Sequence, residues 1–165
     1  MRKKIDERLS LFYIHNFPFL NIYRKKFPHK ATLGIGGNIG DVKRNFKKLF
    51  KLLNQNRDIL VVATSPLLKN PPFGYLDQPY FYNGVIHIYT KMNPKKLLKY
   101  LLKLERRFKR KREFKNAPRT LDLDIIFFDD KKIDTKDLKV PHPKWKERVS
   151  VTIPLKLSGV NFCDL

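Results

Sequence analysis

Hydrophobic residues recur at helical spacing between residues 42 and 53, and lysines fill many of the positions between them. An apolar stripe with a period near 3.6 residues predicts an amphipathic helix whose apolar face is buried. The residues of this stripe are Val42, Phe46, Leu49, Phe50 and Leu53.

A second stripe predicts another amphipathic helix after residue 93. Asn93 is a suitable N-cap, and Pro94 suits the first helical position because that position needs no N–H donor. The residues that we expect on the buried face of this helix are Leu97, Leu98, Leu101, Leu102 and Phe108.

Shorter apolar runs predict four strands, at residues 30–37, 59–65, 85–89 and 120–128. Together with the helices they follow the order strand, helix, strand, strand, helix, strand. That order is typical of the α+β ferredoxin-like fold, a split βαβ arrangement in which helices cover a mostly antiparallel sheet. We expect a short final helix that ends at Pro154, because proline interrupts helical hydrogen bonds.

Two segments lack a regular pattern. Residues 66–83 contain prolines, a glycine and several aromatic residues, which predicts a long ordered loop. Residues 1–29 have no clean period and break at Pro18 and Pro28, which predicts a basic N-terminal arm; the sequence leaves open whether it is flexible. We expect residues 30–165 to form a single domain.

The formal net charge of +21 indicates what kind of partner the protein binds. Charge of that size favours an anionic ligand, such as nucleic acid, a membrane surface or a polyphosphate, although a solvated lysine-rich surface would explain part of it. Much of the excess lies in residues 91–119, where only Glu105 and Glu113 are acidic.

Two further observations concern the location of the protein. No run reaches the roughly 18 apolar residues that a membrane span needs. The lone cysteine, Cys163, cannot form an internal disulfide, so we expect a cytoplasmic protein without a membrane partner.

Two aspartates interrupt the apolar run at residues 120–128. Asp122 and Asp124 share one face of the predicted strand, about 7 Å apart at roughly 3.3 Å per residue. Two like charges there need a compensating cation, and Mg²⁺ is commonly held by one or two carboxylates with water and phosphate oxygens. The alternative is an open face on which both aspartates pair with lysines. The residues expected on the opposite face are Leu121, Leu123, Ile125 and Phe127.

Arg119 extends this interpretation to a phosphate ligand. It stands three residues before Asp122 and follows Pro118, which restricts the local backbone. A guanidinium group matches phosphate bidentately. The carboxylates, the arginine and the basic loop beside them therefore favour a magnesium nucleotide, whereas nucleic-acid binding alone does not require paired carboxylates.

The residues described so far make the chain similar to a known family. The stretch KNAPRTLDLDII resembles the signature of the 6-hydroxymethyl-7,8-dihydropterin pyrophosphokinases of folate biosynthesis, and GIGGNIGD, NPPFGYLDQPYFYN and VPHP agree in order and spacing. The resemblance covers roughly residues 31–157. It implies an enzyme that transfers the β,γ-diphosphoryl group of ATP to the pterin hydroxymethyl oxygen, releases AMP and uses two Mg²⁺ ions.

The resemblance also implies roles for individual residues. The expected metal ligands are Asp122 and Asp124, which are the expected catalytic residues together with Arg119 and Arg110. The residues expected to contact ATP are Arg110, Arg112, Arg119, His142 and Arg148. The residues expected around the pterin are Asn70, Pro71, Phe73, Phe81 and Asn83. Phe81 would stack on the pterin ring and Asn83 would hydrogen-bond to it.

A basic nucleic-acid-binding module is the rival hypothesis. The net charge supports it, as does the similarity of a ferredoxin-like sheet to RNA-recognition platforms. The predicted strands lack the paired aromatic residues that stack on RNA bases, so nucleic acid is the less favoured partner. We therefore expect ATP and 6-hydroxymethyl-7,8-dihydropterin as substrates.

Overall fold

The structure is a computed structural model that describes residues 1–21 and 27–160. Cys163 lies outside the described residues. The strands are β1 (Arg2–Lys4), β2 (Ser10–Phe12), β3 (Phe19–Leu20), β4 (His29–Gly37), β5 (Ile59–Thr64), β6 (Leu67–Asn70), β7 (Phe81–Thr90), β8 (Asp122–Phe128), β9 (Ile133–Asp134) and β10 (Lys139–Val140). The helices are α1 (Val42–Gln55), α2 (Pro94–Arg107) and α3 (Val149–Leu157).

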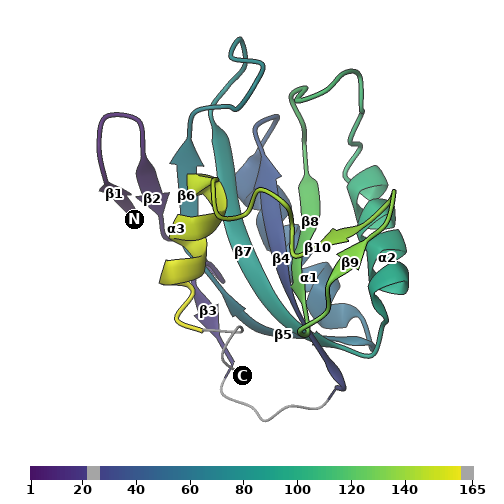
Figure 1. Ribbon diagram of the computed structural model, residues 1–165. Helices are drawn as coiled ribbons and strands as arrows, with labels where there is room; N and C mark the ends of the chain where they lie inside the picture. The colour runs from purple at the N-terminus through teal and green to yellow at the C-terminus, as the bar shows by residue number, and fades with distance from the viewer. Residues whose placement is uncertain (22–26, 161–165) are drawn as a thin grey trace.

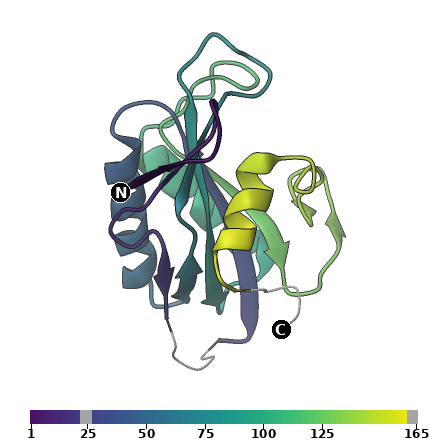
Figure 2. The same ribbon diagram turned by 90° about the vertical axis from the view of Figure 1, so that its left-hand side faces the viewer.

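The central sheet confirms the predicted α+β ferredoxin-like arrangement. β4 pairs with β7 on one side and with β8 on the other, and β5 pairs with β7; all three pairings are antiparallel. α1 and α2 lie on one face of this sheet and α3 on the other, as Figures 1 and 2 show from two directions. The expected order of elements along the chain is therefore present.

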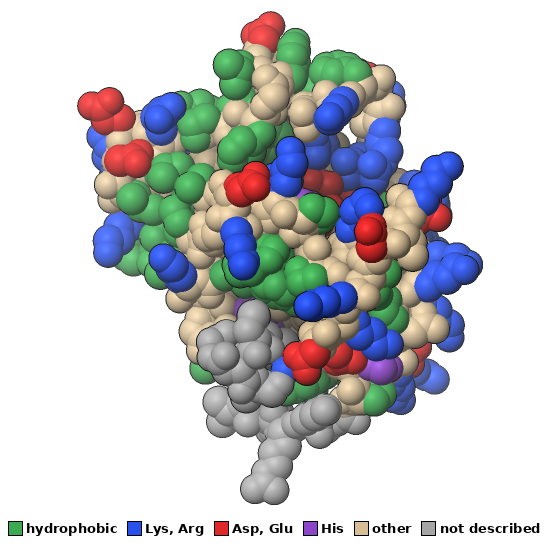
Figure 3. Space-filling view, viewed as in Figure 1, with side chains coloured by type: hydrophobic (Ala, Val, Ile, Leu, Met, Phe, Trp, Pro, Cys, Tyr) green, Lys and Arg blue, Asp and Glu red, His purple; other side chains and the backbone are tan. Residues whose placement is uncertain are grey.

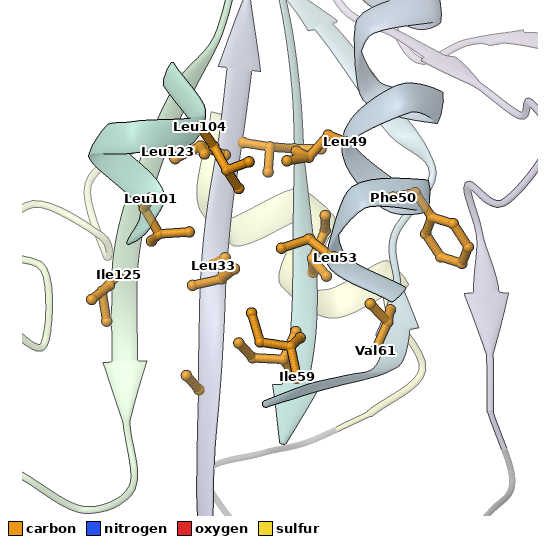
Figure 4. Packing of buried hydrophobic residues seen from close by; sticks show 14 of the residues in the cluster. Leu33, Leu49, Phe50, Leu53, Ile59, Val61, Leu101, Leu104, Leu123 and Ile125 are labelled. Atoms are coloured by element: carbon orange, nitrogen blue, oxygen red, sulfur yellow. The ribbon is translucent and has the colours of Figure 1, made fainter. Parts of the chain in front are cut away.

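The main core lies between the sheet and the pair α1 and α2. Figure 4 shows Leu49 and Leu53 of α1 pointing toward Leu33 of β4, with α2 and β8 closing the other side. The buried residues of α1 are the five that periodicity predicted. Asp41 caps α1 by accepting a hydrogen bond from the backbone N–H of Arg44 at 3.0 Å.

The second helix buries three of the five residues predicted for its inner face, which are Leu97, Leu101 and Phe108. Asn93 is its N-cap and Pro94 its first residue, as expected. Leu104 and Glu105 are buried on its inner face, whereas Leu98 and Leu102 are half-buried. The predicted stripe was wrong in this detail because the basic residues around Glu105 conceal which face turns inward.

A register shift between Thr32 and Leu33 changes the outer half of β8. Leu33 pairs with Ile125 and Thr32 with Phe127, so Ile126 is an extra residue. A bulge of this kind reverses the alternation of side chains beyond it. Phe128 is therefore in the core, while Phe127 packs on Trp145, contrary to the predicted alternation.

Residues 1–21 belong to the sheet, which differs from the expected arm. β2 pairs with β6, and β3 pairs with β5. Phe17 is fully buried and packs against Phe46 and Phe50 of α1, with ring centroids 6.2 and 6.1 Å apart. The sequence concealed these strands because each is only two or three residues long.

Two other elements differ from the predictions. The segment expected as one long loop contains β6 and the start of β7, so its irregular part is residue 66 and residues 71–80. α3 continues through Pro154 to Leu157 instead of ending at the proline. The His87 ring ties α3 to the sheet through contacts of 2.9 Å to Ser158 Oγ and Thr32 Oγ1, and burial lowers its pKa to about 4.

Replacing Phe17 tests whether the N-terminal segment stabilises the fold. Phe17→Ala should lower the free energy of unfolding by about 3–5 kcal/mol, because it removes a buried ring from the core. Urea denaturation measures this change. Ile5→Ala, at a position 45% exposed, is the control and should change stability by less than about 0.5 kcal/mol. Equal, small effects of both changes would contradict the described packing.

Candidate active site

Three loops meet at one end of the sheet, where most of the predicted site residues lie. They are the turn at residues 38–41, the loop at residues 71–80 and the basic loop at residues 108–121. Figures 1 and 2 show the last two loops rising at the same end of the sheet. In the upper right of Figure 3, basic side chains gather around acidic ones.

Asp122 and Asp124 begin β8 and share one face, as predicted. Asp122 lies opposite Gly36 of β4, and Asp124 lies opposite Gly34. The same sheet face carries His87, which contacts α3. The Asp122 side chain is 25% exposed, and Asp124 is half-buried. The pair therefore stands at the mouth of the sheet, on the side that α3 covers.

Two arginines bind Asp122 in the described structure. Arg110 Nη1 donates to Oδ1 at 2.7 Å, and Arg119 Nη1 donates to Oδ2 at 3.0 Å. Both guanidinium-bearing side chains are mostly buried, with exposures of 8% and 17%. Asp122 is thus compensated by charge-assisted hydrogen bonds on both oxygens.

Asp124 is in a different electrostatic environment. Its pKa is raised to about 7, chiefly by desolvation and further by the neighbouring carboxylates of Asp122 and Glu105. Arg148 and Arg110 lower this pKa, but by less. The ionised form of Asp124 is consequently unfavourable until another positive charge approaches it.

His142 and Arg148 lie on the α3 side of the aspartates. Burial lowers the pKa of His142, and the charge of Arg148 lowers it further, while Asp122 raises it. The backbone N–H of His142 donates to Ile126 O at 2.9 Å, which attaches this residue to β8. Both predicted nucleotide contacts are therefore within electrostatic range of the aspartate pair.

Three of the five residues predicted around the pterin, Asn70, Phe81 and Asn83, lie on the paired strands β6 and β7, and Pro71 and Phe73 lie on the loop that follows β6. Asn83 Nδ2 donates to Asn70 Oδ1 at 2.6 Å, and Asn70 Nδ2 donates to Pro71 O at 2.9 Å. The Phe81 ring lies beneath the Arg119 guanidinium, with Cζ 5.4 Å from the ring centroid. Phe73 is 46% exposed on the loop, whereas the other four are buried or half-buried.

Gly36 separates the pterin residues from the aspartates. Asn83, Gly36 and Asp122 form one row across β7, β4 and β8. A Cβ atom on Gly36 would lie 2.6 Å from Asn83 Oδ1, closer than real Cβ contacts allow. Gly36 therefore leaves the space beside Asn83 that any larger residue would fill.

Asn38 is a buried site residue that the sequence analysis missed. Its Nδ2 donates to Gln78 Oε1 and to Pro79 O, each at 2.9 Å, and its Oδ1 accepts from Arg119 N at 2.9 Å. Gln78 Nε2 in turn donates to Asn116 O at 2.9 Å. These bonds join all three loops. The GIGGNIGD stretch was the only signal, since asparagine in a turn is ordinary.

A cavity adjoins Asp124 on the α2 side. It has a volume of about 950 Å³ and lies between α2, β8 and the β9–β10 hairpin. Leu98 and Leu102 line its apolar wall, and Asp124 and Arg112 line it near the basic loop. Its size and mixed lining suit a small organic ligand with an anionic end.

The donor set fits a divalent cation that shares its coordination with a ligand. The described residues contain no group of three or more His, Cys, Asp or Glu arranged to hold a metal ion alone. Asp122 and Asp124 supply two carboxylates, and the raised pKa of Asp124 indicates that positive charge would be favourable there. Mg²⁺ typically takes such a pair and completes its shell with water and phosphate.

The fold is of the α+β class, and the site combines carboxylates and arginines in a way that suits a phosphorylated small molecule. Comparison with known families makes the assignment specific. The chain belongs to the 7,8-dihydro-6-hydroxymethylpterin-pyrophosphokinase family, which matches residues 32–157. The family resemblance seen in the sequence is therefore confirmed, and the nucleic-acid-binding alternative is not favoured.

Several bacterial relatives carry the name 2-amino-4-hydroxy-6-hydroxymethyldihydropteridine pyrophosphokinase. The protein from Campylobacter jejuni is 45% identical over 139 residues, 84% of this chain and 88% of the relative. That from Helicobacter pylori is 41% identical over 148 residues, 88% and 91% of the two chains. That from Bacillus subtilis is 38% identical over 125 residues, 76% and 75%.

Among the residues that the structure describes, no helix is long and apolar enough to cross a membrane.

The environment of Asp124 predicts a pH-dependent cost to stability. Its pKa is about 7 when folded and 3.8 in the reference state, so the folded protein holds this proton more tightly and loses stability as the pH rises through that range. In metal-free buffer, Asp124→Asn should raise the free energy of unfolding at pH 8 by on the order of 2 kcal/mol, and by little at pH 4. Urea denaturation at both pH values measures this difference.

Asp130→Asn is the control, because Asp130 is exposed. It should leave the pH dependence unchanged. Equal stability of Asp124→Asn and the unmodified chain at pH 8 would contradict the described burial of Asp124.

Proposed function

We propose that this chain transfers the β,γ-diphosphoryl group of ATP to the hydroxymethyl oxygen of 6-hydroxymethyl-7,8-dihydropterin. The observation that carries the proposal is the row Asn83, Gly36 and Asp122, which joins the residues expected to bind the pterin to an aspartate pair, of which Asp122 is bound by two arginines. Family membership supports the same reaction.

The cavity beside α2 is the proposed site for the nucleoside of ATP. Its apolar wall at Leu98 and Leu102 suits a base, and its edge at Asp124 and Arg112 directs the phosphates toward the basic loop. The side chains proposed to contact the phosphates are Arg110, Arg112, Arg119, His142 and Arg148. Their positive charges would offset the charge that spreads over the phosphoryl oxygens during transfer.

Asp122 and Asp124 are the proposed ligands of two Mg²⁺ ions that enter with ATP. When bound, these ions would neutralise phosphate charge and polarise the phosphoryl group. Asp122 would then exchange its arginine partners for a cation, and Asp124 would ionise more readily. Both changes remove the charge imbalance of the metal-free site.

The pterin is proposed to bind on the β6 and β7 side of Gly36. Asn83 and Asn70 present paired amides that can match the polar edge of the ring, while Phe81 offers an aromatic face. Pro71 and Phe73 would complete the pocket from the 71–80 loop. In the balanced reaction, the hydroxymethyl oxygen bonds to the β-phosphorus, AMP leaves with the bridging oxygen, and the hydroxyl proton is released.

The two long loops are proposed to close over the substrates. Besides the Gln78–Asn116 hydrogen bond, Tyr75 and Phe114 pack edge to face with centroids 5.1 Å apart. Closure would exclude water and so suppress hydrolysis of ATP. The proposed partners are small molecules, with nucleic acid disfavoured, and the cytoplasm remains the proposed location.

Removal of either carboxylate should abolish the reaction. Asp122→Ala and Asp124→Ala should each lower the rate of AMP formation by at least about 100-fold, because each loses a charge that organises the phosphates. The assay separates AMP from ATP chromatographically and requires that AMP depend on both Mg²⁺ and the pterin. Asp130→Ala, at an exposed position, should keep full activity. Full activity of both site variants would refute the metal assignment.

The pterin side can be tested independently of the nucleotide. Asn83→Ala should raise the KM for the pterin about tenfold, since one buried hydrogen bond is worth about 1 kcal/mol or slightly more, and leave the KM for ATP within about twofold. Steady-state kinetics with each substrate varied in turn gives both values. Asn54→Ala, on the exposed face of α1, is the matched control. An equal rise in both KM values would argue against a pterin-specific role.

A further inference from the structure

Glu105 is a buried carboxylate in the site to which no role has been given. It lies in the last turn of α2 and is only 3% exposed, although the surrounding sequence is strongly basic. A buried carboxylate needs several hydrogen-bond donors to be tolerated. The identity of those donors indicates what Glu105 does.

The end of α2 turns the chain back toward Glu105. Lys109 has a left-handed backbone, with φ of 58°, and its N–H donates to Arg106 O at 2.9 Å. The N–H of Arg110 donates to Glu105 O at 3.2 Å. These two bonds form a Schellman motif, which ends the helix and returns the next residue alongside it. Arg110 is thereby held next to Glu105 by the backbone itself.

The Glu105 side chain binds three groups of the candidate site. Its Oε1 accepts from Arg110 Nη1 at 2.5 Å and from the backbone N–H of Leu123 at 2.9 Å. Its Oε2 accepts from Arg112 Nη2 at 2.9 Å. Leu123 lies between the two aspartates, so one carboxylate fixes the strand that carries them, the Arg110 side chain that contacts Asp122, and Arg112 beside it.

Arg110 is shared between Glu105 and Asp122. Its Nη1 contacts both carboxylates, at 2.5 and 2.7 Å. Its Nε is buried and has no hydrogen-bond partner among the described residues. If Asp122 turns to a cation, the bond to Glu105 still keeps this guanidinium in the site, where its remaining donors are available to a phosphate.

We infer that Glu105 is a positioning residue, which holds Arg110, Arg112 and the β8 backbone in the arrangement that binds the phosphates of the nucleotide. This inference rests on the proposed function. The rival explanation is a buried ion pair that only stabilises the end of α2. The two differ in one respect: positioning affects nucleotide binding selectively, whereas a purely structural role affects both substrate sites through the stability of the fold.

The test replaces Glu105 by its neutral isostere. Glu105→Gln should raise the Kd for α,β-methylene-ATP with Mg²⁺ by about 10- to 100-fold, the range found when a residue that orients a metal ligand is removed. Isothermal titration calorimetry gives this Kd without turnover. The KM for the pterin at saturating ATP should change by less than about twofold.

Glu113→Gln is the matched control, because it makes the same charge change at an exposed position in the same basic loop. It should leave the nucleotide Kd within about twofold. A Glu105→Gln protein that folds and binds the analogue as tightly as the unmodified chain overturns the inference. So does a parallel loss of nucleotide and pterin affinity that follows a fall in Tm.

Glu105→Asp provides a second variant in case Glu105→Gln does not fold. It keeps the buried charge that balances Arg110 but shortens the reach to Arg112 and Leu123, so we expect the nucleotide Kd to rise at least about threefold. Unchanged binding by folded Glu105→Asp would also overturn the inference. Absence of pterin-dependent AMP formation by the unmodified chain would instead reject the proposed function, which separates the two failures.

Discussion

Two carboxylates on one face of a half-buried strand must be compensated by positive charge, and the organisation of the whole site depends on that requirement. Asp122 is compensated by Arg110 and Arg119, which approach from the two ends of the basic loop. Asp124 has its pKa raised instead, because the positive charges nearest to it do not offset its desolvation. In the metal-free protein, an added cation would therefore stabilise the region around Asp124.

Periodicity and capping chemistry were sufficient to predict where the two long helices, α1 and α2, lie along the chain, since both signals are local. The five buried residues of α1 and the N-cap of α2 could be read from neighbours along the chain. β1 to β3 could not, because a strand of two or three residues is stable only through the partner edge that it meets. The bulge at Ile126 was hidden for the same reason: it depends on how β8 matches β4.

Within the site, the sequence predicted what lies close together along the chain. Arg119 and Asp122 are three residues apart, and their ion pair follows from local geometry. Asn38 and Gln78 act across loops that are distant in sequence, so no local pattern revealed them. Glu105 was concealed by its context, because an acidic residue in a lysine- and arginine-rich helix is usually solvated on the outer face.

The row formed by Asn83, Gly36 and Asp122 fixes a distance across the sheet. Neighbouring strands are about 4.8 Å apart, so Asn83 and Asp122, two strands apart, are separated by roughly 10 Å of backbone whose spacing no side-chain rotation can alter. Only a residue without a side chain leaves that interval open for substrate. If the substrates bind as proposed, the distance between the residue that would hold the pterin and the carboxylate that would hold the metal-bound phosphates is therefore set by hydrogen bonds of the sheet, and a loop could move without changing it.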